Sequence, residues 1–198
     1  MAEEAKLEKE ILAELKKDYP MTKESSKEIN LGHFSSFRNG DNFKITYAWK
    51  LANSLQQVSF VKYRNTAIKD KSRYAGVCID LMHVLPEFKI TANTENDKFL
   101  NLYLPNSVKV KAVPAFNHKY ILEAADAGTI EQTIGIEFFN KIMSVQDLNV
   151  EVKDHKCLIY GVYPFNYESC KVMFQLAEDI VKMDQISHSY NPPTYTKE

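Results

Sequence analysis

The segment from residue 62 to residue 74 has the residue types that best fit a chemical task. It holds five basic side chains against one acid, and it includes Tyr63 and Tyr74. Cations bind phosphate groups and aromatic rings stack on bases, so this composition favours contact with a polyanion. A solvated hairpin tip, whose lysines prevent sheet-to-sheet aggregation, has the same composition. The candidate polyanion-binding residues are Lys62, Arg64, Lys69, Lys71 and Arg73. If their strands lay beside this segment, the surface would also include Lys109, Lys111, His118 and Lys119.

Three cysteines could act as nucleophiles or metal ligands. His155 and Cys157 are two positions apart, the spacing at which strand residues share a face, and Cys170 follows thirteen residues later. We expect His155 in a turn and Cys157 in the core, without zinc. Cys170 near a helix start could have a lowered pKa, but a small packed side chain is the simpler expectation. Cys78, also within an apolar run, is expected to be buried and reduced.

Carboxylates and histidines could perform acid–base chemistry if the fold brings them together. Asp80 interrupts an apolar strand, which places it either on a solvent-facing strand end or in a buried functional site. We favour the exposed strand end. An enzyme site assembled in three dimensions stays open, because such sites are recognised by geometry. The residues of such a site would be Asp80, His83, Glu87 or His118. Separately, Asp80 with Glu87, or Glu95 with Asp97, could form a carboxylate pair.

The sequence lacks the short motifs of common enzymes. Neither G-x-G-x-x-G nor G-x-x-x-x-G-K-[ST] occurs, so phosphate-cradling loops have no support, and there is no G-x-S-x-G esterase elbow. We therefore predict no cofactor, and no catalytic, cofactor-binding or metal-ligating residues.

Composition indicates one folded domain. A chain of 198 residues usually forms a single core, and eleven Phe with eleven Tyr exclude a disordered chain. The net charge of −1 gives no global attraction to nucleic acid, so such binding would need a local patch.

The expected location is the cytoplasm. Three widely spaced cysteines suit a reducing compartment, and the acidic N-terminus is unlike a secretory signal. The chain has no apolar run long enough to span a membrane, so we predict no transmembrane segment.

Apolar periodicity predicts the elements. A helix over 2–18 has Leu7, Ile11 and Leu15 on one narrow stripe and stops at Pro20. A capping box, Thr129-x-x-Gln132, predicts the start of a second helix. Period-two alternation or short apolar runs predict strands at 43–49, 57–63, 74–82, 88–92, 100–104, 108–113 and 120–122, and a hairpin of 148–152 with 157–162. The main helices are expected at 129–144 and 167–185.

These elements predict an α+β fold with a mostly antiparallel sheet, two main helices packed on one face and a peripheral N-terminal helix. The expected organisation is a helix at 1–20, one domain at 21–186 and a flexible tail at 187–198. Phe34 and Phe37 are expected to pin the polar connection after the first helix to the core.

Several landmarks follow one another between Phe34 and about Ile186: Phe37 with Gly40, and the segments 85–90, 97–99 and 116–126. In this order of features the chain resembles a group of uncharacterised prokaryotic proteins, in which membrane anchors are common. The resemblance implies a fold and no activity, and this chain differs in having no membrane segment.

The expected function is a non-enzymatic binding or assembly domain that acts through a protein partner. Binding of nucleic acid or an anionic surface through the hairpin 62–74 is one alternative. An enzyme whose site is not visible in the sequence is the other.

Overall fold

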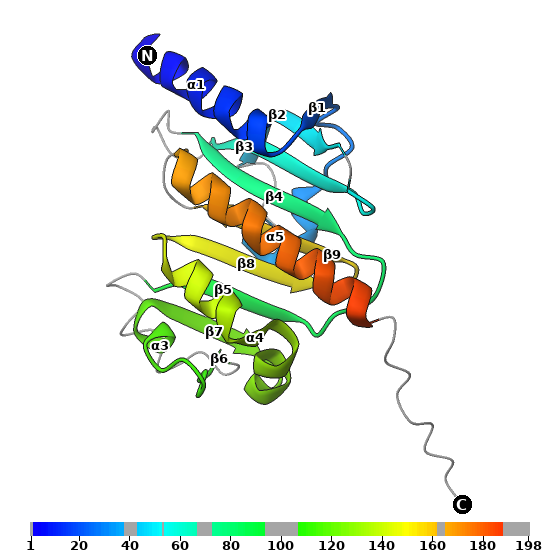
Figure 1. The fold of residues 1–198 in the computed structure, drawn as a ribbon, viewed down its shortest axis with the longest axis vertical. Helices are drawn as coiled ribbons and strands as arrows, with labels where there is room; N and C mark the ends of the chain where they lie inside the picture. The colour runs from blue at the N-terminus through cyan, green and yellow to red at the C-terminus, as the bar shows by residue number, and fades with distance from the viewer. Residues whose placement is uncertain are drawn as a thin grey trace, which may run out of the picture.

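A single antiparallel sheet of nine strands runs through the part of the chain that the computed structural model describes, residues 2–37, 43–52, 54–66, 73–93, 107–161 and 165–187 (Figure 1). The strand order is β1-β2-β3-β4-β9-β8-β5-β7-β6. The predicted α+β class is therefore confirmed. The strands are β1 Met21–Glu24, β2 Phe43–Leu51, β3 Val58–Asn65, β4 Tyr74–Asp80, β5 Phe88–Ala92, β6 Ser107–Val108, β7 Tyr120–Ala124, β8 Leu148–Lys153 and β9 Lys156–Gly161.

The β8–β9 hairpin joins the two halves of this sheet. β2, β3 and β4 form a meander, but β4 pairs with β9 instead of β5, and β8 pairs with β5. The predicted turn is confirmed, and Asp154 adopts a φ of 50° there, which aspartate tolerates better than most residues. This late hairpin fills the centre of the sheet, so the sheet is complete only after most of the chain has been made.

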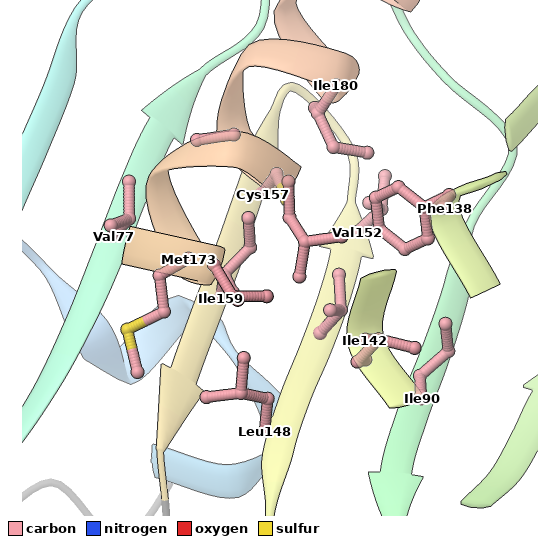
Figure 2. Packing of buried hydrophobic residues seen from close by; sticks show 14 of the residues in the cluster. Val77, Ile90, Phe138, Ile142, Leu148, Val152, Cys157, Ile159, Met173 and Ile180 are labelled. Carbon is pink, nitrogen blue, oxygen red and sulfur yellow. The ribbon is translucent and has the colours of Figure 1, made fainter. Parts of the chain in front are cut away.

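Helices α1 Ala2–Asp18, α4 Ala127–Met143 and α5 Tyr167–Ser187 lie on one face of the sheet (Figure 1). Along each strand, residues that face the helices alternate with residues that face the other side of the sheet, as the period of two requires. Figure 2 shows side chains of α4 and α5 packed on residues of β4, β5, β8 and β9. The residues labelled there include Met173 and Ile180 of α5, Phe138 and Ile142 of α4, and Val77, Ile90, Val152 and Ile159 of the sheet.

The opposite face is covered over β3 and β9 by the connection between β1 and β2. This connection contains two short 3-10 helices, Leu31–His33 and Ser35–Phe37, and Phe34 and Phe37 are buried as expected. Glu151 of β8 holds it in place, since its carboxylate accepts from the Ser35 N–H at 2.6 Å and from Ser35 Oγ at 2.9 Å. Because both faces of β3 are covered, nearly all of its side chains are buried.

Two sequence expectations need correction here. The cap of α4 is Asp126, whose carboxylate accepts from the N–H groups of Gly128 at 3.2 Å and Thr129 at 2.8 Å. The Thr129 hydroxyl donates to the same carboxylate and lowers the pKa of Asp126. The prediction that Thr129 caps the helix was therefore wrong.

Of the expected strand 108–113 only the first residue is in a strand, and the expected strand 100–104 lies outside the described residues. A short helix, α3 Phe116–Lys119, and β1 are additions.

The unusual backbone conformation of Gly135 in α4 can be tested by substitution. Its φ of 71° and ψ of 165° fall in a region that only glycine occupies readily, although a Cβ there would meet no atom within 4 Å. Gly135→Ala should therefore lower the free energy of unfolding by about 1–3 kcal/mol. Gly128→Ala is the control, because its Cβ makes only ordinary contacts and should stabilise by about 0.4–1 kcal/mol. Urea unfolding measures both, and a stabilised Gly135→Ala protein would contradict the positive φ of residue 135.

Candidate functional site

The predicted polyanion-binding residues do not form one open surface. Lys62 is buried, with 3% of its side chain exposed, and its Nζ lies 2.6 Å from Oε2 of Glu8 in α1. Arg73 Nη1 contacts the same oxygen at 2.6 Å, while Arg64 is exposed. Lys69 and Lys71 lie outside the described residues. Polyanion binding by this set stays a prediction, and Lys62 is covered by α1 in this structure.

Other residues considered with this hairpin are now placed. Tyr63 belongs to the core, where its hydroxyl donates to the Gly161 carbonyl at 2.6 Å, so it offers no stacking surface. The four further basic residues do not extend the hairpin surface, because they lie at or beside β6 and β7, at the opposite edge of the sheet from β2 and β3. These residues are Lys109, Lys111, His118 and Lys119.

The cysteines are free thiols. Cys157 and Cys170 are buried, while Cys78 is only partly buried, which corrects the expectation for that residue. Burial raises the pKa of Cys78 to about 12 and also raises the pKa values of Cys157 and Cys170. The lowered pKa considered for Cys170 is therefore contradicted, because desolvation outweighs the helix N-terminus. His155 is exposed in the turn as expected, and the described residues contain no cluster of three potential metal ligands.

The candidate carboxylates are mostly peripheral. Asp80 lies half-exposed at its strand end and pairs with Lys156 at 2.5 Å. Glu87 accepts from the Asp154 N–H at 3.2 Å, whereas Glu95 and Asp97 lie outside the described residues. His118 is exposed. Of the candidate acid–base residues that the structure describes, His83 alone leads to a buried carboxylate.

That carboxylate belongs to Asp184, which is fully buried near the end of α5. Its Oδ2 accepts from the Met82 N–H at 2.7 Å and from the side-chain amide of Gln56, and its Oδ1 accepts from the His83 N–H at 2.9 Å. Nδ1 of His83 lies 3.2 Å from Oδ1 and 3.0 Å from the Asp184 carbonyl oxygen. One side chain thus joins α5, the β4–β5 connection and the β2–β3 turn.

Sequence reasoning missed Asp184. The residue lies four positions after Ile180 and therefore on the buried stripe of α5, where an apolar side chain belongs. An acid at an apolar position of a helix was the available signal. Its partners could not have been identified, because they lie more than one hundred residues earlier in the chain.

Four large exposed apolar side chains surround this network, and we call them the Asp184 rim. They are Leu55, Met82, Val84 and Ile186, with 87%, 61%, 64% and 69% of their surface exposed. Each lies within two residues of a group that bonds to Asp184 or of Asp184 itself. Only three other large hydrophobic residues are exposed in the described part of the chain, and they lie on α1, β2 and α4.

A groove of about 410 Å³ adjoins the rim at Leu55. It lies between the second half of α5, the end of α1 and the end of β2. Its walls are mainly apolar, including Leu51, Val58, Phe174, Ala177 and Val181. Tyr19 stacks on Phe174 with ring centroids 4.2 Å apart. Burial and the nearby carboxylates of Glu178 and Asp18 raise the pKa of Tyr19, and both of these acids also line the groove.

No family model, curated protein or solved structure matches the chain with significance. The resemblance to uncharacterised prokaryotic proteins stays a prediction. In the described part of the chain, none of the helices combines the length and the apolar character needed to cross a bilayer.

Removing the Asp184 charge tests the network. In Asp184→Asn an amide replaces an acceptor oxygen, so at least one buried N–H of Met82, His83 or Gln56 loses its partner. We expect the free energy of unfolding to fall by about 3 kcal/mol in urea titrations. The control is Glu178→Gln, an exposed acid on the same helix, which should change stability by less than about 0.5 kcal/mol. Equal effects of the two variants would contradict the role of Asp184.

Alkaline pH should destabilise the protein. Burial raises the pKa of Tyr120, Tyr160 and Cys78 to about 12, above their ordinary values of 10.0 and 9.0. The folded state therefore keeps protons that the unfolded state releases, and this stabilisation is complete below pH 9 and lost progressively toward pH 12. Urea midpoints measured from pH 8 to pH 11 should fall, and Tyr160→Phe should reduce the slope. A constant midpoint would contradict the buried hydroxyls and thiols.

Proposed function

We propose that this protein is a non-enzymatic binding domain that docks a partner protein over the Asp184 rim and the adjoining groove. The observation that carries the proposal is the grouping of four exposed large apolar side chains around one buried carboxylate. Single exposed hydrophobic residues are normal on protein surfaces, but four of them close to one buried network and a groove are typical of an interaction site.

Rigidity of the backbone supports this proposal. The N–H groups of Met82 and His83 bond to Asp184, so the segment that carries Met82 and Val84 is fixed before any partner arrives. Gln56 fixes the turn beside Leu55 in the same way. A preorganised surface loses little conformational entropy on binding, which favours affinity.

Charge around the groove suggests the chemistry of the partner. Asp18 and Glu178 lie at the groove wall near Tyr19, with Lys182 as the basic lining residue. A partner segment that inserts an apolar side chain and places Lys or Arg near Asp18 and Glu178 has complementary charge. The free thiols also support the cytoplasm as the place where this contact forms.

Position-specific crosslinking tests the docking surface. A photoreactive benzoylphenylalanine at position 55 should give one discrete protein adduct in cells that make the protein, because Leu55 lies on both the rim and the groove. Introducing Met82→Asp and Val84→Asp together should abolish that adduct. Mass spectrometry identifies the attached protein, and a second copy of this chain would indicate an assembly domain.

The matched control is the same probe at position 136, since Ile136 is an exposed apolar residue of α4 with 52% of its surface accessible. It should give no adduct of the same mass. Equal adducts from both positions, or none from position 55, would refute docking at the rim.

A further inference from the structure

The outer half of the β2–β3 pair carries a row of aromatic and cationic side chains. In the register of these strands Lys44 lies opposite Arg64, and Tyr47 lies opposite Lys62. A bulge between Ile45 and Tyr47 keeps both pairs on one face despite the odd spacing. We call Lys44, Tyr47, Lys62 and Arg64 the cationic row.

Positive charge in this row is incompletely neutralised. Lys44 and Arg64 are exposed, and like charges directly opposite one another destabilise a strand pair. Neither side chain has a hydrogen bond or an ion pair within the described residues. Lys62 and Arg73 share a single carboxylate, that of Glu8, at 2.6 Å from each. An anionic ligand would relieve this excess of charge.

Tyr47 gives the row an open aromatic ring. Half of its surface is exposed, and the ring is stacked on Trp49 with an interplanar angle of 19°. Lys62 Nζ lies 5.5 Å from the Tyr47 ring centroid. A half-exposed ring that packs against Trp49 and lies beside a cation suits a stacked base next to a phosphate.

We infer that the cationic row binds single-stranded nucleic acid, with phosphates on Lys44 and Arg64 and a base on Tyr47. Glu8 of α1 competes with a further phosphate for Lys62 and Arg73. The row offers no groove for a duplex and no set of base-reading groups, so the affinity is electrostatic and tolerant of sequence. This inference is independent of the proposed protein-docking surface.

The first half of α1 is the part of the helix suited to such competition. Ile11 and Leu15 are buried and Tyr19 stacks on Phe174, so the second half is firmly seated. Leu7 is exposed, and the Lys6–Glu10 pair lies in solvent. Among residues 6–10, the part of this half whose side chains the structure describes, Glu8 provides the polar contact with the sheet, and a phosphate that replaces it leaves the second half in place.

Fluorescence anisotropy with a labelled single-stranded oligonucleotide of mixed sequence tests the inference on the full chain. Binding at low salt should be saturable, and log K should fall by about 0.7 per phosphate contact in log salt. The double variant Lys44→Glu/Arg64→Glu should abolish binding. Tyr47→Ala should weaken it about fivefold or more, as loss of one stacked base implies. Glu8→Gln should strengthen it.

The matched control is Lys109→Glu/Lys111→Glu, which makes the same charge change at exposed positions beside β6, at the other edge of the sheet. It should leave affinity unchanged, and urea unfolding should show that the row variants stay folded. Absence of saturable binding by both the native protein and Glu8→Gln would overturn the inference. So would an equal loss in the control, or binding of phosphatidylserine vesicles that needs Lys44 and Arg64 but is indifferent to Tyr47.

Discussion

The hydrogen bonds to the buried carboxylate of Asp184 hold together the last turn of α5, the β4–β5 connection and the β2–β3 turn. A charged group without water must have hydrogen-bond donors, and here they come from Gln56, Met82 and His83, all far from α5 in the sequence. The last turn of α5, the β4–β5 connection and the β2–β3 turn are therefore held to a single point. Loops are usually the mobile parts of a protein, but the β4–β5 connection is held at two backbone N–H groups and the β2–β3 turn at the side-chain amide of Gln56.

A second constraint is that the sheet is wide and its two faces are covered to different extents. Helices α1, α4 and α5 cover one face, but the other face has only the connection that contains Phe34 and Phe37. That connection covers β3 and β9, and Glu151 fastens it through Ser35. On the helix side, α1 reaches Lys62 through Glu8, but Lys44, Tyr47 and Arg64 on the same face stay exposed at this end of β2 and β3. Exposure of the cationic row thus follows from how far the covering elements extend.

Much of the fold could be predicted because the sequence carries local periodicity. The strands β2–β5, the β8–β9 hairpin and the helices α1, α4 and α5 follow from spacing of two or 3.6 residues. The insertion of β9 between β4 and β8 could not, since pairing between distant strands leaves no local pattern. For the same reason the contact of Glu8 with Lys62, across 54 positions, turned an expected open cation into a buried one. The cap at Asp126 was missed because Thr129 offered a similar signal three residues later, and the aspartate carboxylate is the stronger acceptor.

The groove and the cationic row share α1, which raises the question of whether they can act separately. Asp18 and Tyr19 form part of the groove wall, and Glu8 covers Lys62 of the row. If the whole helix tilted when Glu8 was displaced, occupants of the two sites would compete, and the coupling would be reciprocal. Tilting must break the Tyr19–Phe174 stack and expose Leu15, whereas in residues 6–10 the single large apolar side chain, Leu7, already has 56% of its surface exposed. Helix ends open locally at small cost. Local unwinding is therefore the easier route, and it leaves the groove intact while it uncovers the row.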